Sequence, residues 1–243
     1  MLAVERDAVG PQADADEAQD GVGKTYSVEF FVLKGGPIKR VEDLKGKVVA
    51  TVGAGSAVDI AMRAMLRKHG LEEKRDYTMV EAGFANMKAM LVEKKVDLVP
   101  GVLPFSFALA EVGNRLFNAK DALGGPTQFV VWTARAGFLQ KNRAAMVDFM
   151  EDAIRSARFF LDPKNQAEAV DIAARVAKLP PSAFQGWAFT EKDVYKDPNM
   201  LPDLEALQRA IDAQQQLGFL KTKIDVKKYA DLSIVKEAAA RIK

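Results

Sequence analysis

Strand-like and helix-like segments alternate between residues 47 and 101, and this alternation constrains the fold more than any other feature. Three short apolar runs suited to strands read KVVATV, YTMVEA and VDLVPG. Between the first two, apolar residues such as Val58, Met62 and Met65 recur at helical spacing. Strand, helix, strand, helix, strand in this order requires a parallel sheet with right-handed crossovers. The pattern therefore predicts a compact α/β lobe over residues 45–124.

The segments on either side of this lobe predict a second lobe. YSVEFFVL, from Tyr26, and QFVVWTAR, from Gln128, have strand composition. After Arg135 the pattern predicts only amphipathic helices, at 142–161, 166–178, 204–217 and from 231 onward. A chain that runs from one lobe into an inserted lobe and back again crosses between them twice, and it forms two lobes with a cleft. We expect a first, helix-rich lobe of residues 26–44 and 125–243, interrupted by the inserted lobe.

The N-terminal residues lack the composition of a folded segment. Residues 1–25 are mostly Ala, Asp, Glu, Gln and Gly, with few large apolar side chains to offset the entropy of ordering. We expect this segment to be disordered or non-native. The first lobe then has only two strands for several helices to cover, so we expect it to be truncated at its N-terminus, to expose apolar surface and to self-associate.

Composition excludes several kinds of function. The 35 basic and 33 acidic residues nearly cancel and are interspersed, which disfavours nucleic-acid binding. The chain has no cysteine and a single histidine, so a thiolate metal site, a thiol nucleophile and any site that needs two histidines are excluded. The longest uncharged apolar stretch, 98–110, is shorter than the ~20 residues of a membrane span. No cofactor, metal or membrane span is expected, and residues 1–10 contain no signal-peptide pattern.

A glycine-rich turn follows the first strand of the inserted lobe and is the strongest candidate for a binding site. Gly53 and Gly55 keep side chains away from the backbone, and Ser56 is placed to cap the following helix, with Asp59 as a capping-box partner. The backbone N–H groups at Ala57 then lie at a positive helix end, which attracts anions. The alternative is a purely structural turn and cap. Asp59, Arg63 and Arg67, spaced four apart, are expected to form a solvated stripe on the helix.

Two further loops and two tryptophans complete the predicted site. The loops after the second and third strands of the lobe should meet the first at one edge of the sheet. Cleft-facing aromatic residues often hold apolar parts of ligands. The additional candidates are Gly83, Phe84, Gly101, Val102, Trp132 and Trp187. No carboxylate pair or nucleophile–base set accompanies them, so we expect a binding protein without catalytic residues.

The order of these blocks resembles a known family. The stretch SVEFFVLKGGPIKRVEDLKGKVVATVGAGSAVDIAMRAML, followed by KKVDLVPGVLPFSFAL, VVWTARAGFLQKNRAAMVDFM and LGFLKTKIDVKKYADLSIVKEA, is similar to the periplasmic substrate-binding proteins of ABC importers. The similar group is the nitrate, sulfonate and taurine (NMT1/THI5-like) group, which includes thiamine-pyrimidine binders. The resemblance extends over nearly all residues from Tyr26.

The resemblance implies a bilobal type II binding-protein fold, a periplasmic location and delivery of a small anionic solute to a permease and its ATPase. It places the solute's polar head at Gly55 and Ser56. This chain departs from the sulfonate binders at Val102 and Leu103, where many carry an aromatic residue and an acid, and it lacks the family's signal peptide and first βαβ unit. The alternatives are a truncated fragment that does not bind, cytoplasmic if Met1 is the true start, or a pyrimidine-precursor binding or synthesis protein.

Overall fold

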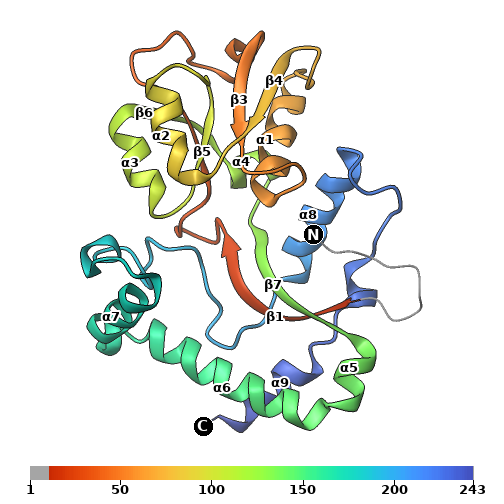
Figure 1. Ribbon diagram of the computed structural model, residues 1–243. Helices are drawn as coiled ribbons and strands as arrows, with labels where there is room; N and C mark the ends of the chain where they lie inside the picture. The colour runs from red at the N-terminus through yellow and green to blue at the C-terminus, as the bar shows by residue number, and fades with distance from the viewer. Residues whose placement is uncertain (1–10, 243) are drawn as a thin grey trace. The chain divides into compact units, whose positions relative to one another are not determined.

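The computed structural model describes residues 11–242 and divides the chain into two compact units. Unit 1 consists of Met1–Tyr26, Thr127–Gln208 and Ile224–Lys243, and unit 2 of Ser27–Pro126 and Arg209–Lys223. Figure 1 shows the elements of each unit along the chain.

Strands and helices follow the predicted order for most of the chain. The strands are β1 (Pro11–Asp20), β2 (Glu29–Leu33), β3 (Lys47–Thr51), β4 (Tyr77–Glu81), β5 (Val99–Gly101), β6 (Gly113–Asn118) and β7 (Thr127–Arg135). The α-helices are α1 (Ala57–Lys68), α2 (Phe84–Val92), α3 (Phe105–Val112), α4 (Ala119–Leu123), α5 (Ala136–Lys141), α6 (Arg143–Leu161), α7 (Gln166–Ala177), α8 (Leu204–Gln216) and α9 (Ser233–Arg241). Short 3-10 helices are η1 (Val41–Leu44), η2 (Pro163–Asn165), η3 (Pro181–Ala183) and η4 (Val226–Tyr229). The four predicted amphipathic helices are confirmed as α6, α7, α8 and α9.

Unit 2 contains a mixed sheet. β3 and β4 pair in parallel from Lys47↔Tyr77 to Thr51↔Glu81, and a parallel bridge between Val49 and Leu98 joins β3 to the segment of β5. β2 runs antiparallel to both β5 and β6. The strand order is therefore β4, β3, β5, β2, β6. The predicted parallel arrangement is confirmed for the three strands of residues 47–101, whereas β6 and the antiparallel pairing were not predicted.

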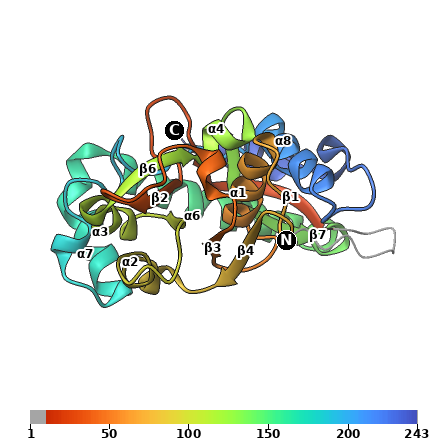
Figure 2. The ribbon, with the colours of Figure 1, turned by 90° about the horizontal axis from the view of Figure 1, so that it is seen from above.

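Helices cover both faces of the unit 2 sheet. On one face, Met87 and Leu91 of α2 and Leu109 of α3 pack with Phe31 and Ala50 of the strands in one apolar cluster. On the other face α1 packs against α4. Figures 1 and 2 show α2 and α3 together on one side of these strands and α1 with α4 on the opposite side. Because β3, β4 and β5 run in the same direction, the turns that follow them lie along a single edge of the sheet.

The expected place of the first strand is wrong. β2, from the segment YSVEFFVL, belongs to unit 2 and forms its antiparallel centre, so residues 27–44 are not part of the helix-rich lobe. Phe30 is fully buried there and stacks on Phe117 of β6, with ring centroids 4.5 Å apart. A strand's composition indicates that it will pair but does not specify its partner, because the partner lies far away in sequence.

The expectation of disorder is also wrong for residues 11–20. They form β1, which pairs antiparallel with β7 from Pro11↔Arg135 to Asp20↔Thr127, with three register shifts. Ala15 is fully buried in the apolar cluster of unit 1, and Ala18 is 6% exposed. Small alanines contribute little to a composition-based estimate, but here β7 supplies the hydrogen bonds and the helices supply the packing. Residues 1–10, which fall under the same expectation, lie outside the described residues.

Unit 1 packs its long helices beside the β1–β7 pair. Leu139 of α5, Val147, Met150 and Ile154 of α6, and Ile234 of α9 are buried together with Ala15. Apolar residues spaced three and four apart on α6 form this buried stripe, which is why its pattern was readable in the sequence. Among the described residues, no helix combines the length and the apolar character that crossing a membrane requires.

Helix α1 ends at a side-chain hydrogen bond that the sequence did not predict. His69 is the C-cap residue, and its Nδ1 lies 2.7 Å from Oε1 of Glu42 in η1. The hydrogen bond with His69 is the main reason that the pKa of Glu42 is lowered from 4.5 to about 2. As the C-cap residue, His69 lies at the negative end of the α1 dipole.

We expect this pair to make stability depend on pH in acid. Because the folded pKa of Glu42 is below its unfolded value, its stabilisation is complete above pH 4.5 and is lost as pH falls toward about 2. Glu42→Gln should therefore lower the melting temperature at pH 5 and have a progressively smaller effect down to pH 2.

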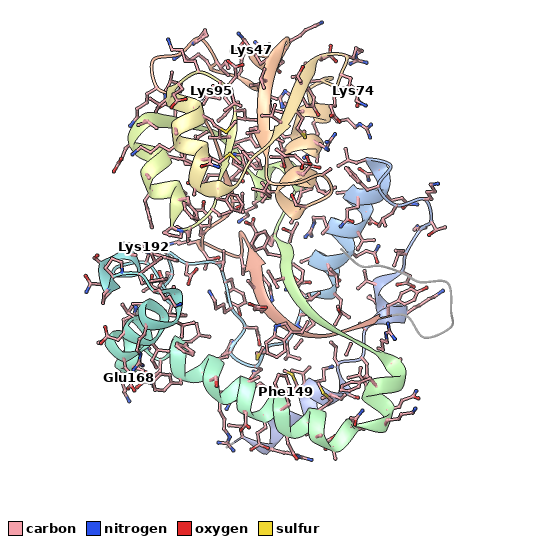
Figure 3. The ribbon with its side chains drawn as sticks, in the orientation of Figure 1. Lys47, Lys74, Lys95, Phe149, Glu168 and Lys192 are labelled. Carbon is pink, nitrogen blue, oxygen red and sulfur yellow. The ribbon has the colours of Figure 1, made fainter. Side chains whose placement is uncertain are left out.

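The matched control is Glu168→Gln, an exposed carboxylate on α7 that Figure 3 labels and that forms no ion pair among the described residues. Melting curves followed by circular dichroism at four pH values suffice. An equal offset between wild type and Glu42→Gln at every pH would contradict the assignment.

Candidate functional site

The carboxyl ends of β3, β4 and β5 bring the three predicted loops to one edge of the unit 2 sheet. Gly53, Gly55, Ser56 and Ala57 follow β3 directly. Gly83 and Phe84 follow β4, and the residues after Gly101 follow β5. Because all three strands run parallel, their loops lie at the same edge, which is where open α/β sheets bind ligands.

The turn after β3 forms the predicted cap. Ser56 is the N-cap residue of α1, and its hydroxyl accepts a hydrogen bond from the N–H of Asp59 at 3.2 Å. The N–H of Gly55 donates to Oδ2 of Asp59 at 2.8 Å. Gly53 and Gly55 have φ values of +159° and +77°, and the second of these is a left-handed conformation that favours glycine. The cap at Ser56 is confirmed, with the reciprocal contact of Asp59 made at Gly55.

Only some donors of this turn remain available. The N–H of Ala54 donates to Oε1 of Glu81 at 3.0 Å, so two carboxylates already occupy the N–H groups of Ala54 and Gly55. Within the described residues, the N–H groups of Ala57 and Val58 make no hydrogen bond. Together with the hydroxyl of Ser56 they form a short row of donors at the positive end of α1.

The expected solvated stripe on α1 is wrong at two of its three positions. Asp59 is fully buried, and the side chain of Arg63 is only 14% exposed. Nε of Arg63 lies 2.9 Å from both carboxylate oxygens of Asp59, and its Nη1 lies 2.6 Å from Glu73 Oε2. Burial alone would lower the pKa of Arg63, but the hydrogen bonds with Glu73 and Asp59 outweigh it and raise the pKa.

A residue that the sequence did not single out covers this pair. Phe219, in the segment after α8, lies against Gly55, where an added Cβ would be 3.4 Å from the ring. The guanidinium of Arg63 is 5.5 Å from the centre of the same ring. The one sequence feature that could have identified Phe219 is its place in LGFL, just after a helix end. Nothing in the local sequence connects it to a turn more than 160 residues earlier. Phe219 and Arg63 therefore fix the back of the turn.

A pair of phenylalanines lies beside the turn after β4. Gly83 is the N-cap residue of α2, without a side-chain hydrogen bond, and Phe84 begins the helix. The ring of Phe84 stacks on Phe105, the first residue of α3, with centroids 6.2 Å apart, and Phe105 is 40% exposed. Sequence reasoning named Phe84 as a site residue, whereas Phe105 was only the last residue of the loop PGVLPF, which the family resemblance aligns with a binding loop. The two rings provide an accessible apolar surface on the same edge.

Gly101 has a packing role. It is buried within β5, and an added Cβ would lie 2.8 Å from the ring of Phe31 and 3.0 Å from Leu109. Val102 is the next residue and is half-buried. Gly101 therefore allows Phe31 and Leu109 to pack against the backbone of β5. Val102, not Gly101, belongs to the loop that follows β5.

One buried hydroxyl near this edge has no partner. Thr51 is the last residue of β3, and its Oγ1 is the one buried side-chain N or O atom without a hydrogen bond among those that the structure describes. An unsatisfied buried donor costs roughly 1–3 kcal/mol. Sequence reasoning could not identify it, because a threonine in a strand is ordinary.

The two predicted tryptophans belong to unit 1, whereas this edge belongs to unit 2. Trp132 of β7 donates from Nε1 to Glu17 at 2.8 Å, and its ring lies 5.6 Å from Phe149, which Figure 3 labels on α6. Trp187 donates from Nε1 to the carbonyl of Ala183 at 2.8 Å and stacks on Phe184. Both indoles make structural contacts within their own unit.

The carboxylates of Asp59 and Glu81 are hydrogen-bonded to the turn at this edge, and the positive end of α1 supplies the favourable field for an anion. Figure 3 places Lys47, Lys74 and Lys95 at the opposite edge, where β3 begins. The available groups at the carboxyl edge are N–H donors, a hydroxyl and aromatic rings, which can hold a small oxyanion with an attached apolar part. These groups are fixed by α1 and by Phe219, so little reorganisation is needed on binding.

Comparison with known proteins agrees with this architecture. A family model described as NMT1/THI5 like matches residues 22–167, more than half of the chain. A comparison with curated proteins gives no significant match.

Solved structures share the fold at low sequence identity. One is described as the periplasmic sulfonate-binding protein SsuA of a putative sulfonate ABC transporter from Methylobacillus flagellatus: it is 18% identical, the match covers 96% of this chain and 69% of that one, and the TM-score is 0.64. The periplasmic nitrate-binding protein NrtA from Synechocystis is 14% identical, with 97% and 68% covered and a TM-score of 0.68. A mutant of the desulfurization enzyme DszB in complex with biphenyl-2-sulfinic acid is 15% identical, with 95% and 79% covered and a TM-score of 0.66. The chain thus has the α/β fold of periplasmic binding proteins, as predicted.

Proposed function

This chain belongs to the NMT1/THI5-like family, and we propose that it is the solute-binding component of an ABC importer that captures a small organic anion. The observation that carries the proposal is the row of donors at Ser56, Ala57 and Val58, at the positive end of α1 and the carboxyl edge of a parallel sheet. Such an arrangement binds oxyanions without a charged side chain. By analogy with the similar periplasmic proteins, the chain would act in the periplasm and deliver its solute to a permease with an ATPase.

We propose a sulfonate with an apolar group in preference to nitrate. The accessible rings of Phe84 and Phe105 lie on the same edge as the donors, and an inorganic anion would leave them in contact with water. An alkyl or aromatic group on the anion would bury part of that surface at about 25 cal/mol per Å². Gly53, Gly55 and Gly83 would let the head group approach the backbone, Val102 would contact the apolar group, and Trp132 and Trp187 remain proposed contacts from unit 1.

The ligand class is tested by thermal unfolding against nitrate, taurine, alkyl and aromatic sulfonates, aromatic carboxylates and a thiamine pyrimidine. A ligand at about 100 times its dissociation constant adds about 2.7 kcal/mol, which corresponds to roughly 5–10 °C for a chain of this size. We expect the largest shift with sulfonates that carry an apolar group. A shift with nitrate alone would contradict this preference, and no shift with any anion would favour a non-binding role.

Replacing Ser56 tests the site itself. Ser56→Ala should remove a hydrogen bond to a charged group, worth about 1.5–3 kcal/mol, and weaken binding roughly 10- to 150-fold. The same change removes the cap and costs about 1 kcal/mol of stability. Ser56→Asp separates the two effects, because aspartate also caps helices but repels an anion. Titration calorimetry with the best ligand measures both variants.

The control is Asn118→Ala, which removes the cap of α4 in the same unit. It should lower stability and leave affinity unchanged. If Ser56→Asp binds the anion as tightly as the wild type, the donors at the end of α1 are not the site.

The likeness to DszB requires a check for turnover, because this fold also serves enzymes. With no cysteine and one histidine in the sequence, we propose binding without chemistry. NMR spectra of the best ligand after prolonged incubation with the protein should be unchanged. New resonances would instead favour an enzymatic role.

A further inference from the structure

Unit 1 contains a pocket of about 410 Å³ that no predicted site residue lines. Three parts of the chain line it. They are Thr25, the stretch from the end of α6 through η2 to the start of α7, and the loop before α8. Its lining residues are Thr25, Leu161, Pro163, Gln166, Phe189, Thr190, Glu191, Asp193, Val194, Tyr195 and Lys196. Pockets of roughly 300–1,000 Å³ are the size class of small-molecule sites.

Part of the pocket wall is aromatic and is formed by Phe189 and Tyr195. The ring of Phe189 lies 5.0 Å from that of Phe160, which in turn makes an edge contact with Phe159. Nζ of Lys196 lies 5.9 Å from the centre of the Phe189 ring. Leu161 and Tyr195 add further apolar surface to the wall. A ligand that offers a flat apolar face gains both area burial and ring stacking here.

The charged groups at the pocket do not favour an anion. Asp193 is 6% exposed, and its carboxylate accepts hydrogen bonds from the N–H groups of Phe189 and Val194 at 2.9 and 2.8 Å. Lys196 lies 3.0 Å from the same carboxylate, so its charge is neutralised. Glu191 is exposed to solvent, which screens its charge. The pocket is thus suited to a neutral ligand.

The loop that supplies the aromatic wall is held in place from both sides. Tyr195 exchanges main-chain hydrogen bonds with Gln19 at the end of β1, at 2.8 and 3.1 Å. The amide of Gln166 donates to the carbonyl of Ala188 at 2.8 Å. Phe189 itself has a φ of +59°, a conformation that is unfavourable for a bulky residue and is maintained by the surrounding hydrogen bonds. The ring is therefore positioned without a ligand.

We propose that this pocket binds a small neutral aromatic molecule, of roughly one to three rings, stacked on Phe189. The site is separate from the anion site of unit 2 and goes beyond the proposed function. It would allow unit 1 to respond to an aromatic compound whether or not an anion is bound at Ser56.

The test uses fluorescence titration with the neutral probe N-phenyl-1-naphthylamine. Wild type should bind it saturably with one site. Phe189→Ala should weaken probe binding tenfold or more. Phe184 is an aromatic residue of the same region that does not line the pocket, so Phe184→Ala should change the affinity less than twofold. Ser56→Asp should leave probe binding unchanged, so failure of the anion site and failure of this pocket are distinguishable.

A second variant covers a folding defect of Phe189→Ala. Leu161→Trp fills the pocket from α6 and should abolish saturable binding with the melting temperature retained. In the Ser56→Asp background, the sulfonated analogue of the probe should bind at least fivefold more weakly than the neutral one. Probe binding that survives Leu161→Trp, or no saturable binding by wild type, would overturn the proposal.

Discussion

Asp59→Ala is expected to destabilise unit 2 by about 3–5 kcal/mol, because it removes one of the two carboxylates that pair with a largely buried arginine, together with the acceptor of the Gly55 N–H. Asp59 is fully buried, and its carboxylate contacts Nε of Arg63 and the N–H of Gly55. After the substitution, Arg63 keeps Glu73 and the sulfur of Met79, and Gly55 loses its acceptor. The measurement is urea unfolding followed by circular dichroism, with hydrogen exchange of the α1 amides to locate the effect.

The matched control is an exposed pair at the same helical spacing. Glu151 and Arg155 on α6 form an i,i+4 pair at 2.6 Å with the arginine side chain 55% exposed, so Arg155→Ala should cost about 0.3–0.5 kcal/mol. The double variant with leucine at both Asp59 and Arg63 should recover much of the loss, since apolar replacements of a buried pair are often neutral. A cost below about 1 kcal/mol for Asp59→Ala would mean that the pair behaves like a surface one.

Phe30→Ala, as an independent variant, is expected to lower the free energy of unfolding of unit 2 by about 3–5 kcal/mol. Phe30 is fully buried in β2, between β5 and β6, and stacks on Phe117. Removing the ring leaves a cavity in the packed core of unit 2, where little relaxation is available. Hydrogen exchange should show faster exchange in β2, β5 and β6.

The location of the effect is as informative as its size. Phe138→Ala, on the exposed side of α5 with 52% of the residue accessible, should change stability by less than about 0.5 kcal/mol. If Phe30→Ala instead loosened β7 and α6, β2 would belong with the helix-rich unit, as its place in the sequence first suggested. Because two units can unfold separately, each is followed by its own amides.

Local patterns were enough for the helices α6 to α9 and for the turn, but not for the short helices α4 and α5. The periodicity of α6 and α8 gave their bounds closely, because burial of one face repeats every three or four residues. Ser56 was recognisable as a cap because it and its hydrogen-bond partner Asp59 lie three residues apart in the sequence. The parallel pairing of β3 with β4 followed from the short helix between them.

Pairing between distant segments could not be predicted in the same way. β1 has the composition of a disordered tail, yet β7 supplies its ladder, more than 100 residues later. β2 looked like a partner for β7 and instead pairs with β5 and β6. β6 itself, with the sequence GNRLFN, has too little apolar alternation to be recognised alone.

The candidate site divides along the same line. The sequence by itself determined the strand–turn–helix unit at Gly53 to Ser56, the family and the absence of cysteine chemistry, since each depends on neighbouring residues or on composition. Only the tertiary structure decided that Asp59 is buried with Arg63, that Phe219 and Phe105 join the edge, and that Phe189 lines a pocket in unit 1. These contacts connect residues that are distant along the chain, and their energies arise only when folding has brought them together.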